Sequence, residues 1–110
     1  MDLLQGTLDM LVLRTLLFGA LHGYGIAKAI RANSGESLDI EFGSLYPSLK
    51  RLELQGWIVS KWDVSETKRQ AKYYRLTPAG RKRLATEHSK WAEFVSAVTR
   101  VMGPMPGGEA

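Results

Sequence analysis

Apolar side chains recur with a helical period in the first third of the chain. Residues 5–18 place leucine and valine at intervals of three and four, which predicts a helix that Gly19 ends. Residues 26–33 predict a second helix, with Ile26 and Ile30 on its apolar face. The glycine-rich stretch between the two predicts a turn. Two short amphipathic helices therefore open the chain.

A third helix is predicted to begin near Ser44. Leu45, Leu49 and Leu52 are spaced i, i+4 and i+7, so that one apolar stripe faces inward. Pro47 fits the first turn of such a helix, because the N–H that proline lacks has no acceptor there. The other side chains of this helix lie off the apolar stripe and are available to a partner.

Extended segments are predicted before and after this third helix. Residues 38–42 alternate apolar and acidic side chains, which indicates a short strand or an extended connector. Residues 57–62 and 72–77 are rich in β-branched and aromatic residues. The polar stretch 63–71 lies between them. These two runs therefore predict a hairpin with a long, basic loop.

A long fourth helix is predicted for residues 78–102, with Thr77 as its N-cap and Pro78 at its first position. Apolar residues repeat along it at intervals of seven and form a seam, which we expect to be buried against the first helix or against a second copy of the chain. The seam comprises Leu84, Trp91, Phe94, Val95, Val98, Val101 and Met102. Residues 103–110 are expected to form a disordered tail.

Composition limits the classes to which this chain can belong. Its 110 residues suffice for one compact domain. The absence of cysteine excludes a disulfide scaffold, a zinc finger and a thiol nucleophile, and two histidines cannot form a histidine-rich metal site. We therefore expect no metal and no cofactor. No stretch approaches the ~20 apolar residues of a membrane span, and no signal peptide is recognised. We expect a cytoplasmic protein without a membrane partner.

Positive charge is concentrated in the middle of the chain. The formal net charge is +4, from 15 basic and 11 acidic residues, and residues 44–90 hold 11 of the basic residues but 4 of the acidic ones. The basic residues form two clusters, one in the third helix (Lys50, Arg51) and one in the hairpin (Lys68, Arg69, Lys72, Arg75). Such a distribution favours phosphate binding. On charge alone, a solvated basic face is an equally good interpretation.

The order of the predicted elements is typical of a winged helix-turn-helix. In that fold the third helix enters the major groove of DNA, and the hairpin touches the backbone or the minor groove beside it. Both basic clusters fall on these two elements. We therefore predict a mainly α fold with a small β-hairpin, in which residues 1–77 form a DNA-binding domain and residues 78–102 form a dimerisation helix.

Four blocks of the sequence resemble a known family. They are LLQGTLDMLVL at 3–13, HGYGI at 22–26, GSLYPSLKRLELQGWI at 43–58 and AKYYRLTPAGRKRL at 71–84. Together they are similar to the PadR family of bacterial transcriptional regulators, in the short form with one C-terminal helix and with phrasing close to its acidobacterial-type subgroup. The resemblance implies a homodimer that binds an operator palindrome, usually as a repressor.

Candidate DNA contacts are carried over only where a residue matches the family's pattern. They are Tyr24, Ser44, Tyr46, Ser48, Lys50, Arg51, Lys68, Arg69 and Lys72. The serines can bond to phosphate or to base edges, whereas Lys50 and Arg51 lie toward the end of the helix, where phosphate contact is favoured over base readout. A solvated helix surface is the alternative for the third helix, and a core-edge tyrosine is the alternative for Tyr24.

Trp91 is the candidate effector-binding residue. In drug-responsive members of the family, a tryptophan at the matching place lines an apolar cavity between two subunits, where flat aromatic compounds stack. An aromatic platform suits such ligands. Ordinary dimer packing at a seam position is the simpler interpretation, so a small aromatic effector remains an open expectation.

Two rival functions are weighed against DNA binding. Asp39 and Glu41 share one side of an extended segment and could pair as carboxylates, but no catalytic histidine or cysteine accompanies them, so we expect no enzyme. A winged helix can also serve as a protein-interaction module. Such a module need not keep positive charge on both the third helix and the hairpin, and the two basic clusters therefore favour DNA.

Overall fold

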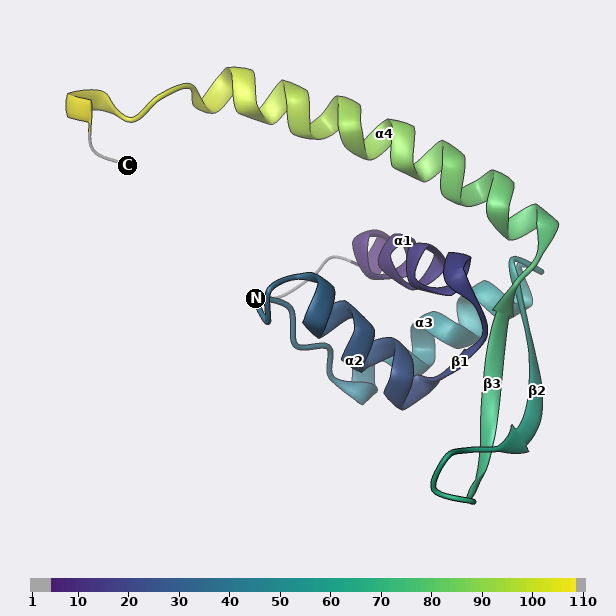
Figure 1. Ribbon diagram of the computed structural model, residues 1–110. Coiled ribbons are helices and arrows are strands. Elements are labelled where there is room, and N and C mark those ends of the chain that lie inside the picture. The colour runs from purple at the N-terminus through teal and green to yellow at the C-terminus, as the bar shows by residue number, and fades with distance from the viewer. Residues whose placement is uncertain (1–4, 109–110) are drawn as a thin grey trace.

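Three helices surround the apolar core in the N-terminal part of the molecule. The computed structural model describes residues 5–108, and in it α1 (Gln5–Thr15), α2 (Gly23–Asn33) and α3 (Phe42–Leu54) pack together, with the short 3₁₀ helix η1 (Leu16–Phe18) continuing α1 (Figure 1). The fully buried apolar side chains are Val12, Leu13, Leu16, Ile26, Leu45, Leu49, Leu52 and Ile58. The predicted apolar faces of the three helices are thus confirmed.

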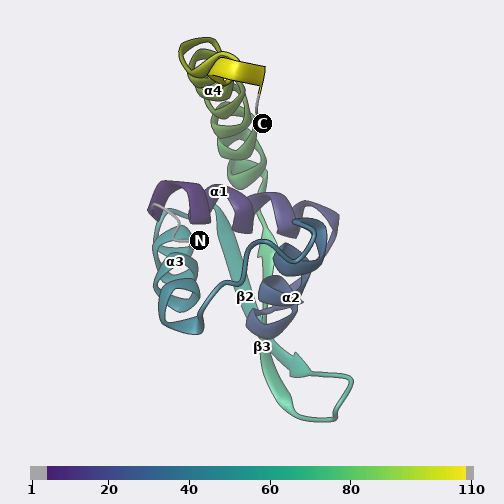
Figure 2. The same ribbon diagram turned by 90° about the vertical axis from the view of Figure 1, so that its left-hand side faces the viewer.

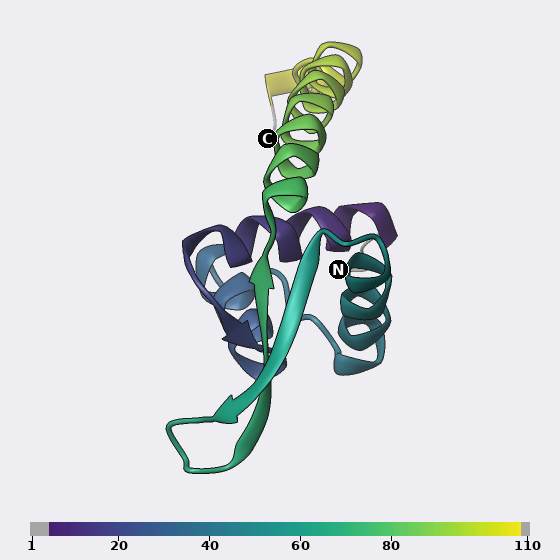
Figure 3. The same ribbon diagram turned by 90° about the vertical axis from the view of Figure 1, so that its right-hand side faces the viewer.

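A small antiparallel sheet completes this part of the fold. It contains β1 (Leu21–His22), β2 (Ile58–Val64) and β3 (Gln70–Leu76) in the order β1-β3-β2. Ile58 lies opposite Leu76 where the sheet joins the core, and the β2–β3 hairpin then extends past the helices (Figure 3). The predicted winged helix-turn-helix with a mainly α composition is confirmed.

The hairpin loop is shorter than the sequence predicts. The strand ladder continues through Asp63 opposite Ala71 and Val64 opposite Gln70, so the loop covers residues 65–69 and not 63–71. Polar residues tolerate strand pairing here because both faces of the hairpin end are in solvent. The tip is therefore a tight turn.

The start of α2 differs from the prediction because His22 caps it. The Nδ1 atom of His22 accepts a hydrogen bond from the backbone N–H of Gly25 at 2.9 Å, so the helix begins at Gly23 and not at Ile26. Leu21 and His22 pair with Tyr74 and Tyr73 of β3, although residues 22–25 are predicted as a turn. A strand of two residues is too short to produce a periodic pattern.

The start of α3 also lies earlier than predicted. Glu41 is its N-cap residue, and its carbonyl accepts hydrogen bonds from the backbone N–H groups of Ser44 and Leu45, both at 3.0 Å. Pro47 is consequently the sixth residue of the helix and not part of its first turn, so one backbone hydrogen bond is missing inside α3. The segment before Phe42 is an extended connector without strand pairing.

The last helix, α4 (Pro78–Met102), is fixed to the rest of the fold at its first turn. The Thr77 hydroxyl accepts from the Gly80 N–H at 3.0 Å and donates to the carbonyl of Gly56 at 2.7 Å. A Cβ on Gly80 would lie 2.0 Å from the carbonyl oxygen of Trp57, so only glycine permits this approach. The predicted cap at Thr77 is confirmed.

Beyond its first turns, α4 packs over α1 and then projects away from the other elements (Figure 1). A 3₁₀ turn, η2 (Pro106–Gly108), follows it. The expected disorder of residues 103–110 stays a prediction, and residues 109–110 lie outside the described part, as do residues 3–4 of the first family block. Within residues 5–108, no helix combines the length and the apolar character needed to cross a membrane.

Candidate nucleic-acid interface

Three separate parts of the chain meet on the side of the molecule that faces away from α4. They are the first turn of α2, the first turn of α3 and the tip of the β2–β3 hairpin (Figures 1 and 2). α2 begins at Gly23 directly after β1, and α3 begins at Phe42 after the extended connector; both starts lie on the side of the hairpin tip (Figure 1). A helix N-terminus presents free N–H groups and a positive dipole end, which favour phosphate. This side is the candidate nucleic-acid interface.

At the start of α2, Tyr24 points into solvent with 62% of its surface exposed. The His22 ring that caps the helix also packs against Tyr73 of β3, with 5.1 Å between ring centroids. Tyr24 is therefore held on a fixed helix start, and its hydroxyl is free to donate to a phosphate oxygen. This exposure favours the predicted DNA contact over a core-edge tyrosine, and the contact itself stays a prediction.

At the start of α3, Tyr46 is half-exposed and Ser44 is exposed. The Tyr46 ring lies 5.7 Å from the ring of Phe42, which is also partly exposed. A Cβ on Gly23 would lie 2.8 Å from the Tyr46 hydroxyl oxygen, so the glycine of the HGYG stretch lets the two helix starts approach closely. Lys50 is exposed farther along α3.

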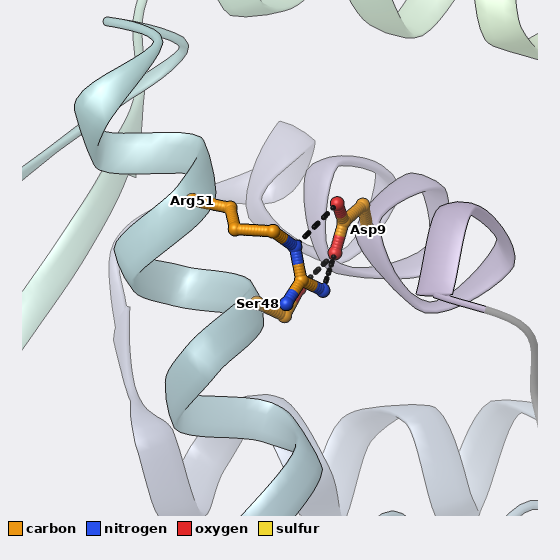
Figure 4. Close-up of polar contacts among 3 residues, drawn as sticks. All are labelled: Asp9, Ser48 and Arg51. Carbon is orange, nitrogen blue, oxygen red and sulfur yellow. Dashed lines mark hydrogen bonds and ion pairs between the residues drawn. The ribbon is translucent and has the colours of Figure 1, made fainter.

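Ser48 and Arg51 are not free on the α3 surface, because Asp9 of α1 engages both (Figure 4). Ser48 is fully buried and donates to Asp9 Oδ1 at 2.5 Å. The Arg51 guanidinium donates through Nη2 to Oδ1 at 2.6 Å and through Nε to Oδ2 at 3.2 Å. The prediction that Ser48 contacts DNA is therefore wrong, and Arg51 is a structural ion-pair partner in this structure.

The hairpin tip presents Lys68 and Arg69 to solvent. The turn is closed by the Ser65 N–H bonding to the Arg69 carbonyl and by the Lys68 N–H bonding to the Ser65 carbonyl, each at 2.8 Å. Lys72 lies instead within β3, and its Nζ is 3.7 Å from the Glu53 carboxylate of α3. Lys72 therefore belongs to the flank of the hairpin and not to its tip.

Glu53 ties the hairpin to α3. Its Oε2 atom accepts a hydrogen bond from the Ser60 hydroxyl at 2.5 Å, while Oε1 faces Lys72. The neighbouring Tyr74 is buried under this contact, and burial together with the nearby Glu53 and Tyr46 raises the pKa of Tyr74. These contacts set the direction in which the hairpin leaves the core.

The apolar seam of α4 divides into a buried start and an exposed remainder. Leu84 is buried in the core of its own chain, so its assignment to the dimer interface is wrong. The other six seam residues are exposed: Trp91, Phe94, Val95, Val98, Val101 and Met102. We call these six the α4 face. Trp91 and Phe94 form an aromatic pair on it, with 5.9 Å between ring centroids.

Comparison with known proteins assigns this arrangement to a family. The sequence profile of the transcriptional regulator PadR-like family matches residues 12–86. The chain belongs to the PadR-like family. A transcriptional regulator from Clostridium thermocellum is 33% identical to it, with a TM-score of 0.79 over 87% of this chain and 93% of that one.

A second similar structure is PadR of Bacillus subtilis in complex with operator DNA. It is 30% identical, with a TM-score of 0.65 over 73% of this chain and 45% of that one. The same Bacillus protein is described as a negative transcriptional regulator. As a PadR-like protein, our chain is a transcriptional regulator and not an enzyme, so Asp39 and Glu41 need no catalytic role.

Sequence reasoning missed the two acidic residues that organise this PadR-like interface. Asp9 and Glu53 each occur in a helix beside apolar neighbours. A carboxylate in an apolar stretch is a signal of a buried partner, because an unpaired buried charge is strongly unfavourable. The partners lie 39 to 42 residues away for Asp9, however, and local spacing cannot identify them.

Proposed function

We propose that the protein is a homodimeric repressor that binds a palindromic operator. The observation that carries the proposal is the gathering of the α2 start, the α3 start and the basic hairpin tip on one side of the molecule (Figure 2). In this arrangement α3 enters the major groove with Ser44 and Tyr46, while Lys68 and Arg69 reach the adjacent backbone or minor groove. Tyr24 donates to phosphate beside them.

The α4 face supports the dimer. Six large apolar side chains are exposed along the half of α4 that projects from the fold, and so long an apolar stripe is unfavourable in water. Antiparallel or crossed packing against the same face of a second copy buries it, since a twofold axis pairs a surface with itself. Twofold symmetry in the protein requires an operator with the same symmetry.

The proposal also includes repression and the binding of an effector. Repression is supported by the description of the Bacillus relative as a negative regulator. Effector binding is supported by the Trp91–Phe94 pair, an aromatic platform that the dimer would place at the subunit boundary. A flat aromatic compound is the chemical class that such a platform accepts.

Salt-dependent binding tests the DNA-binding part of the proposal. A labelled duplex from the DNA upstream of the protein's own gene is titrated by fluorescence anisotropy at two salt concentrations, beside a scrambled duplex. We expect tighter binding to the native duplex, with log affinity falling by about 0.9 per unit of log salt for each phosphate that is neutralised. Weak, salt-insensitive binding to both duplexes would instead support a protein-interaction module.

A further inference from the structure

One face of the β2–β3 hairpin carries an exposed tryptophan that the contacts described so far do not use. Trp62 is 65% exposed, and Val64, two residues farther along β2, is 55% exposed. Large apolar side chains on a narrow two-stranded hairpin bury little surface within their own chain. The strand ladder determines on which face of the hairpin Trp62 and Val64 lie.

The ladder places Trp62 on the side of the hairpin that faces α3. Side chains of a strand alternate between its two faces, so Ser60 and Trp62 share a face, and the residue opposite Trp62 is Lys72. Ser60 and Lys72 both contact Glu53 of α3. The Trp62 side chain therefore continues the surface that runs from α3 toward the hairpin tip.

Among the described residues 5–108, no helix covers this part of the face. The core ends near Tyr74, which lies opposite Ser60, and the hairpin continues past the helices on the side of the molecule away from α4 (Figure 3). The α4 face, which we assign to the dimer, lies at the opposite end (Figure 1). A second subunit packed on α4 thus leaves Trp62 open.

The charges around Trp62 select its partner. Lys72 lies across the ladder, and Lys68 and Arg69 lie beyond it at the tip. Lys68, Arg69 and Lys72 can bind the phosphates of a DNA duplex. The apolar Trp62 ring between them can pack against the deoxyribose and base edges in a groove of the same duplex. An acidic peptide would satisfy the cations but would not match the position beside α3.

We propose that Trp62 is an apolar anchor of the hairpin that packs against sugars or base edges of the operator duplex. The proposal rests on the proposed function. The phosphate contacts of Lys68 and Arg69 hold the hairpin along the duplex, and the indole buries apolar surface between them. Trp62 then contributes affinity without contributing charge.

Salt titration distinguishes the apolar contact of Trp62 from the phosphate contacts of Lys68 and Arg69. In the anisotropy assay on the upstream duplex, Trp62→Ala should weaken binding about tenfold, as expected for losing on the order of 50 Å² of buried apolar surface. The slope of log affinity against log salt should stay unchanged, whereas Lys68→Ala should reduce it by about 0.9. Val59→Ala, on the opposite face of the same strand, is the matched control and should bind as the parent protein does.

Fluorescence supplies a second readout that does not depend on a loss of affinity. The emission of the parent protein should be quenched or shifted when the duplex is added, and Trp62→Phe, which keeps an aromatic ring, should bind well but lose that change. Parent-like binding by Trp62→Ala beside weakened binding by Lys68→Ala would overturn the anchor and leave the proposed function standing. Absence of salt-sensitive binding by the parent protein would overturn both.

Discussion

At the residue scale, Asp9 of α1 determines how α3 is held. Its carboxylate accepts hydrogen bonds from Ser48 and from two nitrogens of Arg51, so a single side chain of α1 fixes two successive turns of α3. Hydrogen bonds to charged groups contribute about 1.5–3 kcal/mol each, and the partial exposure of Arg51 reduces the value here. Arg51, which charge clustering assigns to DNA, therefore serves the fold in this structure.

Asp9→Asn is expected to destabilise the protein by about 1–3 kcal/mol, because the buried Ser48 hydroxyl and the guanidinium lose their charged acceptor. Urea unfolding measures the change. The control is the double variant with Arg51→Met, in which the loss should be smaller than the sum of the two single losses. Additive losses would show that Asp9 and Arg51 do not act together.

At the scale of elements, the hairpin is expected to act as an electrostatic arm. Replacing Lys68 and Arg69 by alanine should weaken operator binding and reduce the salt slope by about 1.8, since two phosphate contacts are removed. Both residues are exposed at a tip outside the core, so the melting temperature should change little. The matched control removes the same charge from the exposed Arg81 and Lys82 at the start of α4. Equal effects of the two double variants would indicate a general charge effect.

The elements also show how far the sequence can predict this structure. Periodic apolar residues predict α1 to α4, with leucine prominent in α1 and α3, isoleucine in α2 and a mixed seam in α4, and the β-rich runs predict the hairpin. Both α2 and α3 begin earlier than apolar periodicity predicts: the His22 side chain caps α2, and α3 begins at Phe42, outside the leucine stripe. The sequence places Ser48 on the surface of α3 and Leu84 in the seam of α4. Both side chains are buried in the structure, because segments distant in the sequence pack against them.

At the scale of the whole molecule, the α4 face is expected to join two copies of the chain. The described chain measures 56 × 28 × 22 Å, and α4 accounts for much of its elongation (Figure 1). An elongated monomer with an exposed apolar helix has little to stabilise that helix in water. Dimerisation would bury the helix and set the distance between two α3 helices.

Val98→Asp is expected to yield monomers in analytical ultracentrifugation and to weaken operator binding, because a carboxylate would be buried in the middle of the α4 face. Ser89→Asp adds the same charge on the opposite side of α4 and should remain dimeric. A dimer in both variants would place the subunit contact elsewhere.

Hydroxyl-radical footprinting of the upstream duplex shows whether the protein binds DNA as a symmetric dimer. A dimer that inserts two α3 helices should protect two patches related by a twofold axis, with their centres one helical turn of about 10 base pairs, or a multiple of it, apart. Weaker protection in the flanking minor grooves should mark the hairpins and disappear when Lys68 and Arg69 are replaced. A single unsymmetrical patch, or uniform protection along the duplex, would show that two α3 helices do not bind an operator with twofold symmetry.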